Sequence, residues 1–360
     1  MSLPSSDLSG GPSTHLPLLR AGLEREGVQI LPFNYTRRKD QETKLEKLRG
    51  RTVDLMRFFY LVLRHRPDLV HHNSAFDPGT LVRDGLLCLV AKLLNVPVFI
   101  KIHGSHRSAF GRVSAFKAAM RGLVVKVSVG LGVLSEAEKQ EFTTRWPKLS
   151  GRVHVVKNVV RDEFIQAQVR EHGRTMVFFT SRFVKEKGMF DLLEAVAAVL
   201  VAHPECRFTF IGGGPDAATF VRRVDQLRLN GSVTYLPNKS FSELIELYRL
   251  GGIFVFPSHF PEGMPMALIE AMAVGLLAVS SSVRFVREVP SFAGNPMLLL
   301  DVAKDVPSQI ARSINHAVGN QNLREQVGLM NKQFAKQYSQ KIVAKDFVEL
   351  YDKLARRRST

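Results

Sequence analysis

The sequence predicts an α/β protein made of two doubly wound, Rossmann-like domains. Two observations support this prediction: short β-rich runs alternate with helical stretches, and the alternation starts a second time near Thr175. Such alternation implies a parallel sheet with helices on both faces. The chain has 360 residues, 45% of them hydrophobic, which is enough for two cores. Because ligands of such sheets bind at the carboxyl ends of the strands, we expect the two domains to face a cleft.

Hydrophobic periodicity places the elements of the first series. We expect helix 16–26, strand 28–33, helix 53–64, strand 69–71, helix 81–94 and strand 96–102. The series opens on SDLSGGPSTHL, which reads as a strand-to-helix turn without the strand that should precede it. The first strand is therefore expected to be missing or short.

The second series begins with the strand MVFFTS after Thr175. Helix 189–202, strand FTFIG, helix 217–228, strand VTYL, helix 242–250, strand IFVFPS and helix 266–274 follow. The restart of the pattern places the domain boundary between about 160 and 174, so we assign 1–165 to a first domain and 166–335 to a second.

Cysteine usage and the apolar runs exclude several classes of protein. Cys88 and Cys206 lie in apolar runs without metal-binding spacing, so they are expected to be buried, reduced thiols of a cytosolic protein. The start MSLPSSDLSGG does not resemble a signal peptide. The longest apolar runs, 86–100 and 123–134, are shorter than the roughly 20 residues that span a bilayer.

The net charge of +17 is concentrated in the first half of the chain. Residues 1–160 hold 25 Lys and Arg against 13 Asp and Glu, which accounts for +12 of the total. This asymmetry favours an anionic partner of the N-terminal half: a membrane surface, a nucleic acid or a phosphorylated substrate.

The segment FPEGMPMALIEAMAVGL contains two glutamates, Glu262 and Glu270, eight residues apart. Pro265 suits the first position of a helix that Gly275 ends, so Glu262 lies in the preceding loop and Glu270 within the helix. The free N–H groups of the first turn, at Met266 and Ala267, suit a phosphate or sugar oxygen. Glu270 can accept two hydroxyl hydrogens from a ribose. A helix cap followed by a surface glutamate explains the same spacing.

Two further loops each follow a strand. In FFTSRFVKEKG, Arg182 can bind two phosphate oxygens and Lys187 adds a mobile charge, although a solvated charged turn has the same composition. In FIGGGPDAA, three glycines open a helix, but the third glycine of a dinucleotide fingerprint is absent. A nicotinamide cofactor is therefore poorly supported.

Together, SRFVKEKG, IGGGPD and VFPSHFPEGMPMALIEAMAVG, in this order, resemble the retaining glycosyltransferases of family 4, the glycosyltransferase group 1 domain with the GT-B fold. The resemblance extends to GGPSTHL, IKIHGSH, VLSEAEKQEF and VVKNVV, and to a C-terminal helix ending in LYDKL. It implies an acceptor-side domain 1–165, a nucleotide-sugar domain 166–335 and a C-terminal helix 336–360 that returns to the first domain.

The resemblance also implies roles for individual residues. Arg182 and Lys187 neutralise the leaving diphosphate, Glu262 contacts the donor sugar, and His103 faces that sugar from the first domain. Glu270 binds the ribose, and the backbone at Gly10 and Gly11 approaches the phosphates. The catalytic set is then His103, Arg182, Lys187 and Glu262, and the donor-binding set is Gly10, Gly11, Gly213, Gly263, Met264, Met266, Ala267 and Glu270.

Three positions depart from the family pattern. Pro265 replaces a glycine and removes an N–H donor, and Lys157 replaces the usual proline before Asn158. Arg284 and Phe285 replace small glycines before Glu288. Because Arg284 and Phe285 are bulky, the family's acceptor-side arrangement and its role for Glu288 do not carry over directly to this chain.

A basic segment lies in the first domain, where no acidic residue occurs between Asp84 and Glu136. Phe110, Val113, Phe116 and Met120 recur there at helical spacing, as on a helix at an anionic membrane, but a stripe that packs into the core has the same spacing. The proposed membrane or acceptor face is Arg112, Phe116, Lys117 and Arg121. Nucleic acid is disfavoured because no recognition motif or stacking platform accompanies the charge.

The expected function is a retaining hexosyltransferase that needs no metal and no cofactor beyond its substrate, a UDP- or GDP-linked sugar. We expect a glycan or lipid-linked acceptor in cell-envelope polysaccharide synthesis, and a peripheral location at the inner face of the plasma membrane. Two alternatives remain: a non-catalytic GT-B scaffold at a membrane, and a nucleotide-sugar epimerase on the same fold.

Overall fold

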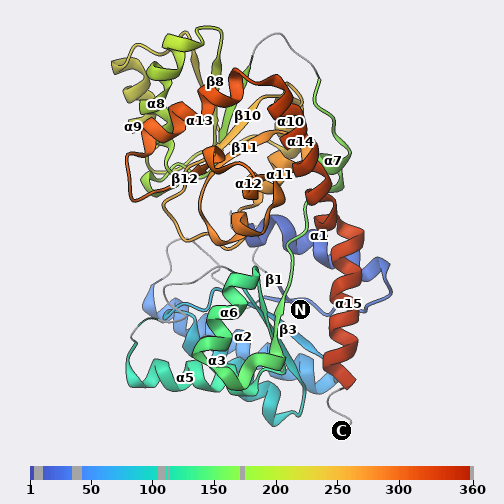
Figure 1. The fold of residues 1–360 in the computed structure, drawn as a ribbon. Coiled ribbons are helices and arrows are strands. Elements are labelled where there is room, and N and C mark those ends of the chain that lie inside the picture. The colour runs from blue at the N-terminus through green and yellow to red at the C-terminus, as the bar shows by residue number, and fades with distance from the viewer. Residues whose placement is uncertain (4–10, 35–42, 104–110, 112, 171–174, 357–360) are drawn as a thin grey trace. The chain divides into compact units, whose positions relative to one another are not determined.

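The computed structural model describes the chain except for residues 4–10, 35–42, 104–110, 112, 171–174 and 357–360 (Figure 1). The chain forms two compact units. Unit 1 comprises Met1–Val159 together with Gln340–Thr360, and unit 2 comprises Val160–Ser339. In both units every strand pairing is parallel, so the α/β class expected from the alternating pattern is confirmed.

Unit 1 contains a four-stranded sheet of order β3-β4-β5-β6 and a two-stranded pair, β1-β2. Its strands are β1 (Ser2–Leu3), β2 (Phe33–Asn34), β3 (Val70–Ser74), β4 (Val98–Ile102), β5 (Gly130–Val133) and β6 (Val153–Val155). Its helices are α1 (Gly11–Arg25), α2 (Lys44–His65), α3 (Leu81–Leu93), α5 (Ala115–Val127), α6 (Glu136–Arg145), the 3-10 turn Pro147–Arg152 and α15 (Gln340–Arg356). The Ser2 hydroxyl accepts from the Asn73 N–H at 2.7 Å, which ties β1 to β3.

The two faces of the unit 1 sheet carry different helices, and strand β4 shows this directly. Val98, Ile100 and Ile102 of β4 share one buried cluster with residues of α2, α3, α5 and α6. Phe99, between them, belongs to a second cluster with residues of α1 and α15. Because successive side chains of a strand point to opposite faces, α2, α3, α5 and α6 cover one face and α1 and α15 the other.

Unit 2 contains a six-stranded sheet of order β12-β11-β10-β7-β8-β9. Its strands are β7 (Met176–Thr180), β8 (Arg207–Ile211), β9 (Val233–Leu236), β10 (Ile253–Phe256), β11 (Leu277–Ser281) and β12 (Leu299–Leu300). Its helices are α7 (Asp162–Gln166), α8 (Met189–Ala202), α9 (Ala217–Gln226), α10 (Phe241–Tyr248), α11 (Met266–Val274), α12 (Pro290–Ala293), α13 (Val306–Val318) and α14 (Gln321–Ala335). Its 3-10 turns are Lys185–Lys187, Arg284–Glu288, Pro296–Leu298 and Lys336–Tyr338.

The order of these strands creates a switch point between β7 and β10. After β7 the chain adds β8 and β9 on one side, then returns to place β10 on the other side of β7. The loops that leave β7 and β10 therefore diverge at the carboxyl edge of the sheet. This is where open α/β sheets form a crevice for ligands.

Some boundaries differ from those expected. Of the expected strand 28–33 only Phe33 lies in a strand, because β1 offers just two residues to pair with. The Val28 N–H instead donates to the Leu23 carbonyl, and the Leu31 carbonyl accepts from the amino group of Met1. The units divide after Val159 and again after Ser339, rather than at 165 and 335. Among the described helices, none combines the length and the apolar character that a membrane span needs.

Candidate active site

The loops after β7 and β10 are packed directly against each other at the switch point of unit 2. A Cβ atom on Gly188 would lie 2.2 Å from the Pro257 carbonyl oxygen, and Gly188 has a positive φ of 78°, so only glycine fits there. The His259 N–H donates to the Glu186 carbonyl oxygen at 2.8 Å, and the His259 ring contacts the Asp191 carboxylate at 2.9 Å. These contacts hold the two loops together.

Lys187 and Glu262 form an ion pair across this junction. Lys187 ends the 3-10 turn after β7, and Glu262 lies in the loop after β10. Both side chains are about one-fifth exposed, at 21% and 19%, and the Ser258 hydroxyl donates to the same Glu262 oxygen at 3.3 Å. The sequence predicted both residues as site residues, and the structure brings their charged groups together. Arg182, in the same loop as Lys187, is exposed.

The loop after β8, which contains Gly212, Gly213 and Gly214, is hydrogen-bonded to the loop that carries Arg182. The Phe183 N–H donates to the Gly213 carbonyl at 2.8 Å, and the Lys185 N–H donates to the Asp216 carboxylate at 2.8 Å. A Cβ atom on Gly212 would lie 1.9 Å from the Ser181 carbonyl oxygen. The glycine at Gly212 is therefore explained by packing between two loops. At Gly213 a Cβ would meet the Asn238 amide at 3.3 Å, a tight contact.

Helix α11 begins at Met266, and Pro265 is its N-cap rather than its first helical residue. Pro265 gives no side-chain hydrogen bond to the first turn, and Gly275 ends the helix in the left-handed conformation, as expected. The N–H groups of the first turn, at Met266 and Ala267, thus start at the end of the loop that holds Glu262. Gly263 and Met264, just before them, are buried.

Glu270, in the second turn of α11, is a buried carboxyl group, 7% exposed. Within the described part of the chain it has no hydrogen-bond partner, and burial raises its pKa to about 8 even though the Arg161 guanidinium opposes that shift. A buried carboxylate without a donor is costly. The side chain is therefore poised to accept hydrogen bonds from a bound molecule.

His103 lies in unit 1, directly after β4. Its Nε2 is 2.8 Å from Oδ1 of Asn73, while Nδ2 of Asn73 donates to the Ser2 carbonyl oxygen at 2.8 Å. The amide orientation therefore makes Oδ1 an acceptor and His103 Nε2 the protonated nitrogen. In the neutral ring, Nδ1 is then left as an acceptor, which suits a hydroxyl group.

A buried polar group beside His103 was missed by the sequence reasoning. The rings of His15 and His103 have centroids 5.2 Å apart, and neither nitrogen of the fully buried His15 has a hydrogen-bond partner among the residues that the structure describes. Burial, with the nearby Lys101 ammonium, holds the pKa of both imidazoles well below the usual value. Lys101 is itself buried, which lowers its pKa to about 7, and its Nζ donates to the Lys157 carbonyl at 3.1 Å.

The predicted membrane or acceptor residues on α5 separate into two kinds. Phe116 is 61% exposed, but Met120 from the same stripe packs against Gly85 of α3 and the core of unit 1. Lys117 is partly exposed, and Arg121 donates to the Gly111 carbonyl at 3.1 Å. Within the described part of this stripe, Met120 packs into the core and Phe116 does not, while Phe110 lies outside the described residues. Arg112 and Gly10 lie outside the described residues, while Gly11 begins α1.

The bulky residues that replace small ones before Glu288 are accommodated inside unit 2. Phe285 is buried and its ring lies 6.1 Å from that of Phe334 and 6.0 Å from that of Tyr338. Arg284, beside it, is about half-buried, which lowers the pKa of its guanidinium to about 10. Phe285 therefore fills the core rather than the candidate site.

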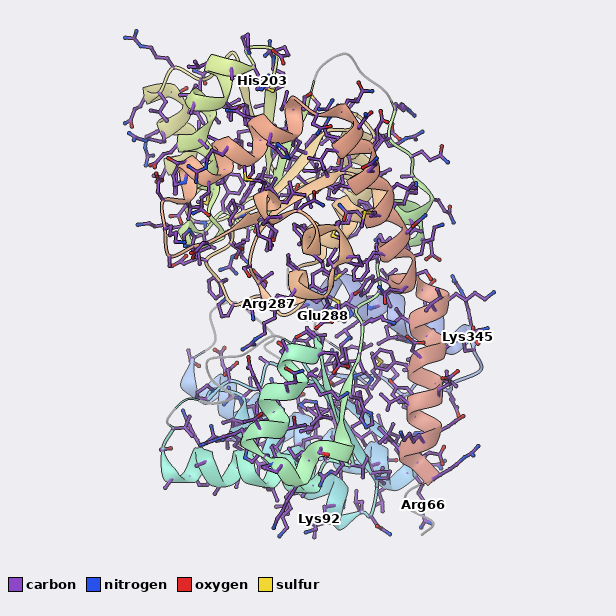
Figure 2. All side chains as sticks on the ribbon, in the orientation of Figure 1. Arg66, Lys92, His203, Arg287, Glu288 and Lys345 are labelled. Carbon is purple, nitrogen blue, oxygen red and sulfur yellow. The ribbon has the colours of Figure 1, made fainter. Side chains whose placement is uncertain are left out.

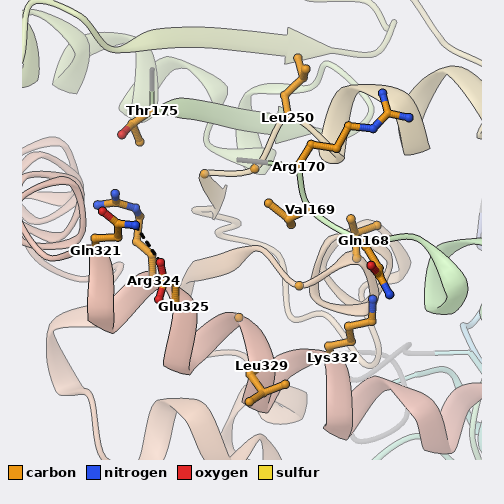
Figure 3. Close-up of a pocket in the computed structure, with 15 residues that line it drawn as sticks. Gln168, Val169, Arg170, Thr175, Leu250, Gln321, Arg324, Glu325, Leu329 and Lys332 are labelled. Atoms are coloured by element: carbon orange, nitrogen blue, oxygen red, sulfur yellow. Dashed lines mark hydrogen bonds between the residues drawn. The ribbon is translucent and has the colours of Figure 1, made fainter. Parts of the chain in front are cut away.

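A cavity of about 670 Å³ in unit 2 lies at the opposite edge of the sheet (Figure 3). Thr175 and Gly252, which line it, precede β7 and β10. Its polar side chains bond to the protein: Gln321 donates to Glu325 at 2.8 Å, and the Lys332 ammonium donates to the Ala167 carbonyl. Size alone does not make this cavity the chemical centre.

Comparison with known proteins agrees with the motifs. Residues 160–334 match the family described as glycosyl transferases group 1. Over 228 residues the chain is 25% identical to spore coat protein SA of Bacillus subtilis (strain 168), covering 61% of this chain and 58% of that protein. It is 26% identical over 228 residues to the putative teichuronic acid biosynthesis glycosyltransferase TuaC of the same strain, covering 60% and 54%. The chain thus spans little more than half the length of these relatives.

Among solved structures, Alr3699/HepE of Anabaena in complex with UDP superimposes with a TM-score of 0.73. The alignment covers 98% of this chain and 99% of that one, with 14% sequence identity. At this identity the similarity shows the fold of the whole chain and nothing finer.

Proposed function

From the premise that this chain is a glycosyltransferase with a group 1 domain at residues 160–334, we propose that it is a retaining, metal-independent hexosyltransferase. Its donor is a UDP- or GDP-linked sugar bound by unit 2. Its acceptor is a glycan or a lipid-linked glycan in cell-envelope polysaccharide synthesis, reached from the inner face of the plasma membrane.

The observation that carries the proposal is the ion pair of Lys187 and Glu262 at the switch point of unit 2. Open α/β sheets bind their ligands at this switch point, and both charged groups are partly exposed there. A diphosphate sugar presents the matching groups side by side: phosphate oxygens for Lys187 and sugar hydroxyls for Glu262.

The chemistry assigned to these residues follows from charge. When the bond between the sugar carbon and the diphosphate oxygen breaks, negative charge grows on the diphosphate, and Lys187 and Arg182 stabilise it. The acceptor oxygen bonds to that carbon on the same face, and the acceptor proton passes to the leaving diphosphate. Because two side-chain cations offset this charge, we propose that no metal ion is needed.

The remaining residues bind and orient the donor. The backbone N–H groups of Met266 and Ala267 start α11 and suit a phosphate oxygen, and Glu270 can accept both ribose hydroxyls. His103 offers Nδ1 to a sugar hydroxyl. The UDP complex of Alr3699/HepE and the teichuronic acid assignment of TuaC support a nucleotide donor and an envelope product.

Thermal shift against a panel of UDP-, GDP- and ADP-sugars tests the donor assignment, since a ligand that binds the folded state raises its melting temperature. We expect one UDP- or GDP-sugar to give the largest shift. The absence of any shift across the panel would refute the donor site.

Product analysis with that donor tests the finer claims. Retention predicts an anomeric configuration in the product equal to that in the donor, and metal independence predicts unchanged turnover in excess EDTA. Conversion of the donor sugar without any acceptor would instead identify an epimerase. Donor binding without turnover of any kind would favour the non-catalytic scaffold.

A further inference from the structure

Helices α2 and α3 of unit 1 expose large apolar side chains on their outer surfaces. On α2, Met56, Phe59, Tyr60 and Leu63 are exposed at helical spacing, with Tyr60 at 67%. On α3, Leu86, Leu89 and Leu93 are exposed at the same kind of spacing, with Leu93 at 75%. Each helix therefore carries a second apolar stripe, opposite the stripe that it buries in the core.

The two exposed stripes belong to one layer. Helices α2, α3 and α5 cover the same face of the unit 1 sheet, and α3 packs against both α2 and α5. Side chains on these helices that do not face the sheet or a neighbouring helix point away from it. Phe116 of α5, 61% exposed, extends the apolar surface. We call this outer surface of α2, α3 and α5 the outer face.

The charge of the outer face is predominantly positive. From Arg49 to the end of α5, the described residues of these three helices include two carboxylates, Asp54 and Asp84, and both are buried. The exposed basic residues are Arg49, Arg51, Arg57, Arg64, Lys92 and Lys126. Figure 2 shows Lys92 projecting from the edge of the ribbon. The described part of these helices has one exposed carboxylate, Glu46 in the first turn of α2, and beyond that turn the exposed charges beside the apolar stripes are basic.

The other helices of unit 1 show that this is not a general property of the unit. Helix α6, on the same face of the sheet, carries Glu136, Glu138 and Glu141 and no large exposed apolar side chain. Helix α15, on the opposite face, carries three carboxylates and one exposed large apolar residue, Ile342. An apolar surface ringed by cations is therefore confined to the outer face.

We propose that the outer face docks unit 1 onto an anionic lipid bilayer. Aromatic and aliphatic side chains of α2 and α3 enter the headgroup region, and the arginines and lysines around them bind lipid phosphates. Soluble proteins seldom leave apolar patches of this kind uncovered. A bilayer matches both the apolar residues and the excess of positive charge, whereas a second copy of this face would bring like charges together.

This surface differs from the one that the sequence indicated. The predicted stripe lay on α5, and α5 contributes Phe116 at one end while Met120 is partly buried against the core. Docking shares with the proposed function only the membrane-borne acceptor. It is measured without donor, so a failure of docking and a failure of donor binding are separate results.

The test is co-sedimentation of the full chain with vesicles of phosphatidylcholine, with or without about one-third phosphatidylglycerol, in about 50 mM and about 500 mM salt. We expect binding to the anionic vesicles at low salt and much weaker binding at high salt. Leu63→Gln with Leu93→Gln, and separately Arg57→Glu with Arg64→Glu, should each lower the partition coefficient about tenfold or more. All four positions are exposed, so the variants should fold.

Matched controls lie in unit 2. Val201→Gln with Leu329→Gln makes the same chemical change at exposed apolar positions, and Arg222→Glu with Arg223→Glu reverses two exposed charges on α9. Both controls should bind vesicles like the wild type, and all variants should keep the donor-induced thermal shift. Equal losses in the controls and in the outer-face variants would overturn the proposal.

A tryptophan reporter tests the orientation directly. In a Trp146→Phe background, Leu93→Trp should show a blue-shifted emission and quenching by brominated lipid when anionic vesicles are added, and Val201→Trp should show neither. The proposal is wrong if the wild-type chain does not bind anionic vesicles at low salt. It is also wrong if light scattering shows a dimer that the Leu63 and Leu93 variants dissociate, since a second copy would then cover the face.

Discussion

The polar groups beside the candidate ligand-binding loops are charged in unit 2 and neutral in unit 1. Unit 2 holds an ammonium and a carboxylate, Lys187 and Glu262, as a partly exposed ion pair between two loops. Unit 1 holds the rings of His15 and His103 in contact and tilted by 35°, with the pKa of both imidazoles well below the ordinary value. The first arrangement suits a charged diphosphate, and the second suits neutral hydroxyl groups. The predictions below test this contrast.

The largest effect is expected at Lys187. Lys187→Ala should lower kcat/KM about 10³-fold, because it removes a charge that stabilises the leaving diphosphate. Lys185→Ala is the matched control: Lys185 is exposed in the same turn, and we expect its activity within about twofold of wild type. Steady-state kinetics with saturating acceptor measures both. Equal activities of the two variants would remove Lys187 from the mechanism.

At Glu270 we expect donor binding to change the number of bound protons. The raised pKa of about 8 means that the free carboxyl is largely protonated at pH 7, and ribose hydroxyls that donate to it would favour the carboxylate. Donor binding should therefore release a proton, visible in calorimetry as a dependence on the ionisation enthalpy of the buffer. Glu270→Gln should abolish the release and weaken donor binding about 10- to 100-fold.

The same residue predicts a pH dependence of stability. Its folded pKa of about 8 lies above the ordinary 4.5, so the folded state binds more protons between these values and stability falls as pH rises through them. Glu270→Gln should flatten this part of the profile and raise the melting temperature more at pH 8 than at pH 5. A larger gain at the lower pH would contradict the assignment.

Asn73 is a positioning residue for His103, whose ring we expect to be neutral. Variants of Asn73 test that role. Asn73→Leu should lower kcat about tenfold, because His103 would lose the acceptor that fixes its tautomer. Asn73→Asp keeps an acceptor but adds a charge that raises the pKa of His103, so a new acid limb should appear in the pH–rate profile. If Asn73 were merely structural, the aspartate variant would show an unshifted profile.

The smallest effect on activity is expected at Lys101, where the readout is stability. Its folded pKa of about 7 lies below the ordinary 10.5, so burying the ammonium costs most below pH 7 and the cost disappears as pH rises toward 10.5. Lys101→Met should therefore stabilise the protein by about 1–3 kcal/mol at pH 6 and by less at pH 10. Urea unfolding at the two pH values measures the difference, and NMR of His103 should show its pKa rising.

Elements that depend on local sequence signals could be predicted, and elements that depend on contacts with distant segments could not. Helix 189–202 was located closely from its apolar residues, and helix 266–274 from Pro265 before it and Gly275 after it, since both signals are local. Strand 28–33 was largely wrong because a strand depends on its neighbour, and the length of β1 is not encoded in that segment. Phe116 and Met120 belong to one helically spaced stripe in the sequence. Met120 is partly buried because it packs against α3, whereas Phe116 is exposed, and the sequence does not show where α3 lies.

Within the candidate site, the motifs located the residues but did not show which side chains pair or how deeply they are buried. The pairing of Lys187 with Glu262 joins positions 75 residues apart, and the bond of Asn73 to His103 joins positions 30 apart, so no local pattern could show them. A lysine in the run VFIKI resembles an outward-facing residue of an alternating strand. The fold instead buries Lys101 completely, between the sheet and Phe347 of α15.

The membership of α15 in unit 1 has a consequence for synthesis of the chain. Val343, Phe347 and Leu354 of α15 complete the buried cluster that includes residues of α1 and β4. In the sequence, all of unit 2 separates α15 from the rest of unit 1. A ribosome therefore releases every residue of unit 2 before the last helix of unit 1 emerges. Unit 2 can fold as a continuous segment during translation, whereas unit 1 must wait, with the surface of α1 exposed to chaperones until the final turn of α15 leaves the exit tunnel.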